Sequence, residues 1–313
     1  MNIDIIRIFA FVFIVMLHTL NRQYGLNVWI GGYAVISIGV NLFIMVSGYL
    51  LLDRDEPMKD FLKKRFFGII PLFVVFNVIY IYFYKLPVLP ILKGKSFAAP
   101  HFWYIYMIIG IYLLTPWLRK VLPYAEKETF YVTVLWFLCN VLNPNMRYFN
   151  LPEIPFSNFP ITGFLGYYLI GYYLKKYLWK IKKIPLFYTI LVYSAGFLIS
   201  AVFTKYVLNS TGKRVSVFFD KNSLGTFFMT ISFFAFWLKF DFKKRSRVIK
   251  IISDSTYFAF LIHIIVLHYA IRISDEMIFK SVATVVISIL IGILYNYFEK
   301  MIKNLLKEKH IIN

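Results

Sequence analysis

The chain has 313 residues, of which 60% are hydrophobic and 16% charged, and its mean hydropathy is +0.67. Soluble domains carry roughly a quarter of their residues as charged side chains, so this composition excludes an ordinary soluble fold. The net charge of +20 would suit a nucleic-acid-binding protein, but Lys and Arg cluster at the ends of apolar blocks and form no recognition stripe. We interpret these clusters as topology signals and expect a lipid bilayer, and no nucleic acid, as partner.

The N-terminal apolar block is expected to be an uncleaved first helix. Asp4 precedes any basic residue, and no small-residue cleavage pattern follows the apolar run, so the block does not resemble a secretory signal. Cys139 is the single cysteine and lies within an apolar segment. One cysteine excludes an intramolecular disulfide and argues against a metal-thiolate site, so we predict no metal.

Apolar runs matched against the bilayer length predict about ten transmembrane helices, and the expected fold is therefore all-α and polytopic. The expected spans are residues 3–20, 29–51, 66–84, 102–118, 129–143, 161–174, 184–204, 223–240, 251–270 and 278–298. The fifth and sixth are short, and a fused or re-entrant arrangement there would change the count to nine or eleven.

The distribution of basic residues predicts the orientation. With a cytoplasmic N-terminus, the inner connections and tail hold 23 Lys and Arg residues, the outer connections hold 11, and Arg7 lies inside the first span. Positive charge is retained on the cytoplasmic side, so we expect both termini inside and the gaps 85–101 and 143–160 outside. A bacterial cytoplasmic membrane is the expected location.

The whole chain, 1–313, is expected to form one integral-membrane domain. It contains no soluble domain, long linker or low-complexity tract. We find no internal repeat, and this weakens a transporter interpretation because many transporter folds are built from duplicated halves.

A polar stripe follows one face of the first expected helix. Its members recur at steps of three or four residues: Asp4, Arg7, Phe11, Ile14, His18 and Asn21. The eleven residues between Arg7 and His18 correspond to about 16 Å of helix, roughly half the hydrocarbon thickness. An ionisable group at this depth is costly unless it faces a partner or a water-filled cavity, so both are candidate functional residues.

Structural roles for the stripe remain open at this point. Arg7 could extend to the lipid headgroups and pair with Asp4, and His18 could form a hydrogen bond to a neighbouring helix. Finding both on one stripe favours a functional role.

Four blocks of the sequence resemble the acyltransferase-3 family of membrane O-acyltransferases, in matching order over nearly the whole chain. The first is 3–19, in which ten residues separate Arg7 from His18. The others are 41–51, then 102–104 with 110–116, and finally 255–257 with 261–263. Two departures stand out: Gly68 occupies the place of a second arginine after Arg65, and the fourth helix lacks an acidic residue that many members carry.

The resemblance implies an O-acyltransferase, with acyl-CoA as donor substrate and acetyl as the commonest acyl group. We expect the acceptor to be a hydroxyl of an extracytoplasmic glycan or lipid-linked sugar. His18 is then the general base, since an imidazole pKa of about 6.5 suits proton transfer near neutrality. Arg7 would bind the donor phosphates, with Lys64 and Arg65 as further donor-binding candidates.

Other residues are weaker candidates for the acceptor site or the cavity: Asn21, Ser47, Trp103, Tyr104 and His263. Ser47 could carry the acyl group, although a Ser before a Gly more often serves close helix packing. His263 is expected near the depth of His18, where a cavity role and a packing role are equally open. His101 and His268 are expected at the membrane interface and receive no role.

Two other classes of function remain open on the sequence. One is a transporter or exporter of a polysaccharide or small solute, with Arg7 and His18 lining its path. The other is a non-catalytic assembly or sensor component in which the stripe only joins helices. The acyl group, the acceptor and the oligomeric state leave no trace in the sequence.

Overall fold

A computed structural model describes residues 1–20, 26–142, 163–212, 217–242 and 246–311, and all regular elements in these ranges are helical. The all-α prediction is thus confirmed for this part of the chain. The elements, in order, are α1 (Asn2–Thr19), α2 (Leu26–Ile36), α3 (Gly39–Leu51), α4 (Met58–Tyr84), α5 (Val88–Leu92), α6 (Trp103–Val121), α7 (Glu126–Phe137), the π-helix η1 (Leu138–Leu142), α9 (Leu165–Lys176), α10 (Leu178–Lys183), α11 (Leu186–Thr211), the 3₁₀ helix η4 (Val217–Phe219), α12 (Leu224–Leu238), α13 (Arg247–Ile273) and α14 (Met277–Ile311).

Six helical segments of the described residues are long and apolar enough to cross a membrane: Asn2–Thr19, Ile30–Leu51, Met58–Tyr84, Leu186–Ser210, Arg247–Ile273 and Met277–Leu305. The chain is thus polytopic by length and composition. The other four expected spans coincide with α6, with α7 and η1, with α9, and with α12. The total of ten stays a prediction.

The expected span 29–51 is not one continuous helix. A turn at Ser37 and Ile38 separates α2 from α3, and the Ser37 hydroxyl donates to the Ala34 carbonyl at 3.0 Å. Side-chain bonds of this kind compete with helix hydrogen bonds. The turn lets Gly39 approach α1 so closely that an added Cβ would lie 2.9 Å from the Ala10 carbonyl oxygen.

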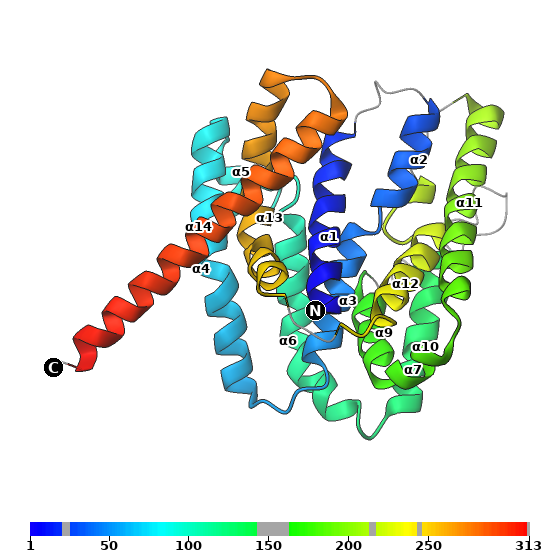
Figure 1. The fold of residues 1–313 in the computed structure, drawn as a ribbon, viewed down its shortest axis with the longest axis horizontal. Coiled ribbons are helices and arrows are strands. Elements are labelled where there is room, and N and C mark those ends of the chain that lie inside the picture. Colours follow the sequence, from blue (N-terminus) through cyan, green and yellow to red (C-terminus); the bar gives the residue numbers. More distant parts are fainter. Residues whose placement is uncertain (21–25, 143–162, 213–216, 243–245, 312–313) are drawn as a thin grey trace.

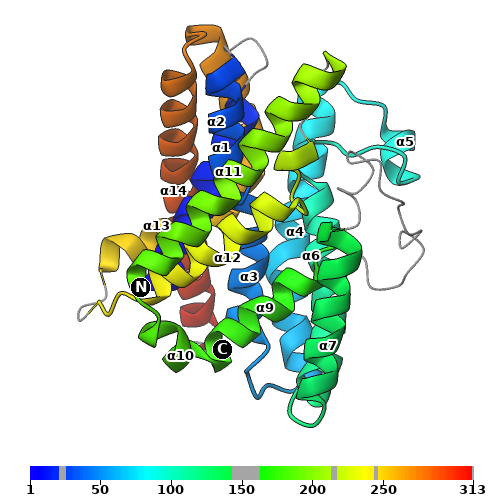
Figure 2. The same cartoon turned by 90° about the vertical axis from the view of Figure 1, so that its right-hand side faces the viewer.

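Helix α1 lies at the centre of the bundle (Figure 1), in contact with α2, α3, α12, α13 and α14. Around it, α13 packs against α14, α11 against α12, and α3 against α9. Figure 2 shows α9 crossing α3. The polar stripe of α1 is therefore enclosed by other helices.

Two glycines set the distance between α3 and α9. A Cβ on Gly48 would lie 1.8 Å from the Tyr168 carbonyl oxygen, and a Cβ on Gly171 would lie 2.1 Å from the Met45 carbonyl oxygen. Each helix thus places a glycine against the backbone of the other, as small residues do where membrane helices approach closely. This contact explains the Ser-Gly pair at 47–48 by packing and holds Ser47 beside the cavity described below.

The peripheral helices present apolar side chains outward. Val78 on α4 is 62% exposed, Leu198 on α11 is 56% exposed and Leu290 on α14 is 54% exposed. An exposed apolar surface spread over several long helices is the surface that lipid covers. It is the opposite of the polar exterior expected of a soluble bundle.

Candidate active site

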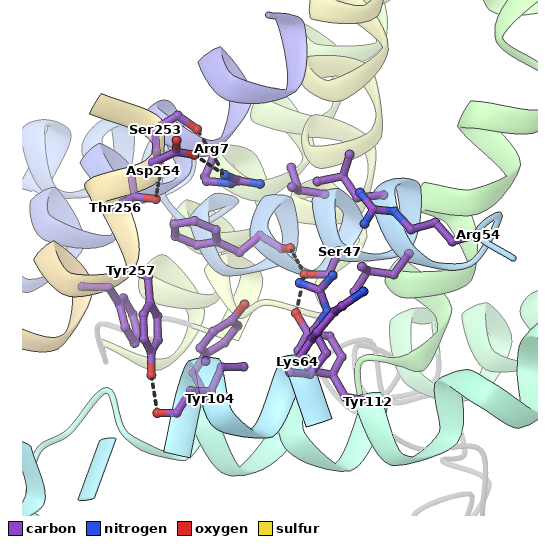
Figure 3. A pocket seen from close by; sticks show the side chains of 18 residues that line it. Arg7, Ser47, Arg54, Lys64, Tyr104, Tyr112, Ser253, Asp254, Thr256 and Tyr257 are labelled. Atoms are coloured by element: carbon purple, nitrogen blue, oxygen red, sulfur yellow. Dashed lines mark hydrogen bonds and ion pairs between the residues drawn. The ribbon is translucent and has the colours of Figure 1, made fainter. Parts of the chain in front are cut away.

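A cavity of about 450 Å³ lies among α1, α3, α4, α6 and α13 (Figure 3). Its lining contains four basic side chains and one acidic one: Arg7, Arg54, Lys64, Arg65 and Asp254. The volume lies within the usual range of ligand pockets, about 300–1,000 Å³. The charge balance favours an anionic ligand.

Arg7 is held at the cavity wall by α13. Its Nη1 lies 3.3 Å from the Ser253 hydroxyl and 4.0 Å from the Asp254 carboxylate, as Figure 3 shows. The pairing with Asp4 that the sequence left open is not among the ion pairs of the described residues; Asp4 lies 3.4 Å from the N-terminal ammonium of Met1. A guanidinium has five N–H donors, so these contacts leave donors of Arg7 available to a ligand.

Lys64 and Arg65 reach the cavity from α4, as the sequence predicts. Lys64 forms an ion pair with Glu56 at 2.6 Å, and this hydrogen bond lowers the pKa of the Glu56 carboxyl. The Arg65 guanidinium lies 5.7 Å from the ring centroid of Phe61. Its buried Nε has no hydrogen-bond partner in the described part of the chain.

Arg54 is a further cavity residue that the sequence analysis treated only as a topology signal. It follows α3 directly in the connection to α4. The available signal was its position as the first basic residue after the second span. One of the four basic side chains that line the cavity was therefore not among the predicted site residues.

Ser47 and Tyr104 both line the cavity. The Ser47 hydroxyl donates to the Phe43 carbonyl at 3.1 Å and lies 3.3 Å from the Tyr112 hydroxyl. The hydroxyl is thus within reach of a cavity ligand, but no described histidine activates it.

Three aromatic rings, those of Phe43, Tyr104 and Phe260, line the cavity and lie close to one another. Their centroids lie 6.2 Å apart for Phe43 and Tyr104, 6.4 Å for Phe43 and Phe260, and 5.3 Å for Tyr104 and Phe260. The Phe260 ring also contacts His101 at 5.0 Å and His263 at 5.7 Å. We call these three rings the aromatic layer; through Phe260 it touches both the basic cavity and a cluster of histidines.

The histidine cluster consists of His18, His101 and His263. Ring centroids lie 5.3 Å apart for His18 and His263, 4.6 Å for His101 and His263, and 6.4 Å for His18 and His101. His263 is fully buried and His101 is 3% exposed, whereas His18 keeps partial exposure. The structure thus brings His18 and His263 together and adds His101, to which the sequence analysis assigned no role.

Trp103 lies away from the basic cavity, beside Lys221. The Lys221 ammonium lies 4.0 Å from the Trp103 ring centroid and is close enough to His18 for its charge to act on the imidazole. The Lys221 carbonyl accepts hydrogen bonds from Asn41 at 2.7 Å and Tyr167 at 2.8 Å. These contacts fix the backbone position of Lys221. The sequence did not indicate this charged residue near His18.

Of the remaining expectations, Asn21 lies outside the described residues, as does the loop 143–160. Cys139 is a buried free thiol. Among the described residues, no group of three or more His, Cys, Asp or Glu side chains is arranged to hold a metal ion.

Comparison with known proteins gives one family. A family model described as an acyltransferase domain matches residues 2–297, and the four-block resemblance is thereby confirmed. No curated protein and no solved structure matches the chain.

Proposed function

The chain belongs to the acyltransferase-3 family, and we propose that it is a membrane-bound O-acyltransferase that transfers an acyl group, acetyl by default, from cytoplasmic acyl-CoA to a hydroxyl of an extracytoplasmic glycan or lipid-linked sugar. One observation carries the proposal. The same helix, α1, contributes Arg7 to a basic cavity and His18 to a histidine cluster. An anion-binding group and a base are the two groups that acyl transfer from acyl-CoA requires.

The basic cavity is the donor site in this proposal. CoA carries a diphosphate and a further phosphate, and arginine guanidinium groups bind phosphate through paired hydrogen bonds. Arg7, Arg54, Arg65 and Lys64 line this cavity. Because Lys64 already forms an ion pair with Glu56, the arginines are the principal ligands of the CoA phosphates in this proposal, and Lys64 adds positive charge.

The aromatic layer lies on the route from donor to base. Phe260 touches both the cavity and the histidines, so a thioester bound in the cavity reaches His18 only when rings of this layer move aside. Exclusion of water until the donor arrives would limit wasteful hydrolysis of the thioester.

In the chemical step, His18 takes the proton of the acceptor hydroxyl as its oxygen attacks the thioester carbonyl. The new O–C bond forms, the C–S bond breaks, and the CoA thiolate leaves. The proton then passes from His18 to the thiolate and yields the CoA thiol. A positioned general base of this kind contributes a factor of about 10² to 10⁴ in rate.

The region of Trp103 and Lys221 is the proposed acceptor side. An indole ring offers a flat surface for the apolar face of a sugar, and the ammonium above it offers hydrogen bonds to hydroxyl or acidic groups. Neither residue lines the basic cavity. In this proposal donor and acceptor would thus bind at different places near the base.

The proposed orientation places the basic cavity on the cytoplasmic side of the membrane. Both chain ends and the α3–α4 and α6–α7 connections lie in the lower half of Figure 1, and the α13–α14 connection lies at its upper edge. The excess of basic residues, 23 against 11, supports assigning the lower side to the cytoplasm of a bacterial cell.

One argument weighs against a transporter: the chain lacks a detectable internal repeat. The deciding experiment incubates the purified protein in lipid nanodiscs with acetyl-CoA that carries a radiolabelled acetyl group. An enzyme transfers or slowly hydrolyses the label, whereas a conduit leaves acetyl-CoA intact.

A further inference from the structure

The histidine cluster has a fixed hydrogen-bond direction at one end. Nδ1 of His263 lies 2.6 Å from the Phe260 carbonyl oxygen. A carbonyl oxygen only accepts, so Nδ1 carries the proton and Nε2 of neutral His263 is an unprotonated acceptor. That Nε2 is buried and finds no hydrogen-bond partner among the described residues.

His101 lacks hydrogen-bond partners of its own in the part of the chain that the structure describes. Both of its ring nitrogens are buried without a hydrogen-bond partner in the described ranges, and its ring is 4.6 Å from that of His263. The Leu261 carbonyl also lies near His101; it accepts from the Tyr80 hydroxyl at 2.9 Å and keeps a second lone pair. The acceptors beside His101 are therefore this carbonyl and Nε2 of His263, and buried polar groups are nearly always paired.

His18 completes the cluster at its accessible end. Its ring lies 5.3 Å from His263 and 6.4 Å from His101, so reorientation of the rings can bring its N–H to the acceptor nitrogen of a neighbour. With His263 as that neighbour, the donors of His18 and His263 both point toward the Phe260 carbonyl. The inward nitrogen of His18 carries its proton, and the other nitrogen keeps a lone pair.

We propose that His263 and His101 are positioning residues that hold neutral His18 in the tautomer whose outward nitrogen is unprotonated. This inference rests on the proposed function, because that nitrogen is the one that takes the acceptor hydroxyl proton. The Phe260 carbonyl performs the orienting role that a carboxylate performs in many catalytic triads. It does so without a buried negative charge, which would be costly at this depth.

Nitrogen NMR of the protein with isotope-labelled histidine rings tests the proposal directly. The chain has five histidines, and substitution of each in turn assigns the signals. At a pH where the cluster is neutral, we expect Nδ1 of His263 to be protonated and His18 to occupy one tautomer. A wild-type spectrum in which neutral His18 shows both tautomers in similar amounts overturns the proposal, whatever the variants do.

A matched pair of variants separates positioning from packing. His263→Phe keeps a ring of similar size but removes the acceptor, and we expect a mixed His18 tautomer and a loss of tenfold or more in kcat, with KM for acetyl-CoA little changed. His263→Gln returns an acceptor oxygen and should restore a single tautomer and part of kcat. His268→Phe, on the same helix, is the control.

The outcomes distinguish this inference from the proposed function. A folded His263→Phe protein with a single His18 tautomer and full kcat overturns the positioning role while acyl transfer stands. A wild-type protein with the expected spectrum but no transfer or hydrolysis of the acetyl label overturns the proposed function, and the positioning role in that reaction with it.

Discussion

Phe260 and His263, one helical turn apart on α13, face two different sites. The Phe260 ring lines the basic cavity, whereas the His263 ring packs against His18 at 5.3 Å. In the proposed function, the aromatic layer to which Phe260 belongs is thus the boundary between donor binding and proton transfer. This relationship gives the proposed route of the thioester a specific point at which it can be tested.

Replacing Phe260 should uncouple hydrolysis of acetyl-CoA from acyl transfer to the acceptor. We expect Phe260→Ala to raise hydrolysis of acetyl-CoA in the absence of an acceptor, because water and thioester then meet near the histidines. Truncation of a buried Phe costs about 3–5 kcal/mol of stability, so thermal unfolding is measured alongside. Phe258→Ala is the control, since Phe258 packs on Phe76 and Tyr295 away from the cavity. Unchanged hydrolysis by a folded Phe260→Ala protein would show that Phe260 is not a barrier between the thioester and the histidines.

Arg7 should bind the donor through its guanidinium geometry. We expect Arg7→Lys to weaken acetyl-CoA binding, seen chiefly as a higher KM, because the charge remains while bidentate contact with phosphate is lost. Arg7→Ala should weaken it further. In either variant Asp4 keeps its ion pair with the N-terminal ammonium, and Asp254 keeps its ion pair with Lys250. The fold should therefore survive.

Calorimetric titration of acetyl-CoA measures the effect of the Arg7 variants. Arg272→Lys, an exposed change at the far end of α13, is the control. If both Arg7 variants bind acetyl-CoA with wild-type affinity, Arg7 anchors the helix and the donor site must be sought around Arg54 and Arg65.

The α3–α9 contact should be intolerant of a single methyl group. Gly171→Ala would place its Cβ 2.1 Å from the Met45 carbonyl oxygen, so the helices must separate, and we expect a loss of about 1–3 kcal/mol typical of overpacking. Gly110→Ala on α6 meets no atom within 4 Å and should be neutral or slightly stabilising. Thermal unfolding of both variants in one detergent makes the comparison. Equal melting temperatures would contradict the packing account.

The membrane topology can be read with two single cysteines in a Cys139→Ser background. Ser96 and Tyr124 are both exposed, and the proposed orientation puts Ser96 outside and Tyr124 inside. Ser96→Cys should react with an impermeant maleimide applied to intact cells, and Tyr124→Cys should react only after permeabilisation. The reverse pattern would invert the orientation and move the basic cavity to the outer face.

The sequence was sufficient for those parts of the site that one helix encodes. The spacing of Arg7 and His18 along α1 placed a cation and a base on one face, and the structure puts Arg7 in the basic cavity and His18 in the histidine cluster. Ser47, Lys64, Arg65 and Tyr104, which the sequence also singled out, line the cavity. A periodic pattern on a single helix needs no knowledge of its neighbours.

The parts that escaped prediction depend on how separate helices pack. His101 precedes α6 outside any span, and only its packing beside α13 brings it to 4.6 Å from His263. The aromatic layer joins Phe43, Tyr104 and Phe260 from three helices. In a chain that is 20% aromatic, no local pattern distinguishes these rings from those that face lipid. The break at Ser37 likewise accompanies a close contact between Gly39 and α1, which lies on a separate helix.

The measurement that tests the central claim most directly compares wild-type and His18→Ala proteins in nanodiscs with radiolabelled acetyl-CoA. The wild type should transfer or slowly hydrolyse the acetyl label. His18→Ala should lose a factor of about 10² to 10⁴ in rate while binding acetyl-CoA with nearly unchanged affinity, because the base is removed and the basic cavity is intact. His268→Ala should retain the wild-type rate. Full activity of a folded His18→Ala protein would contradict the assignment of His18 as the base, and absence of any acetyl transfer or hydrolysis by the wild type would contradict the enzyme itself.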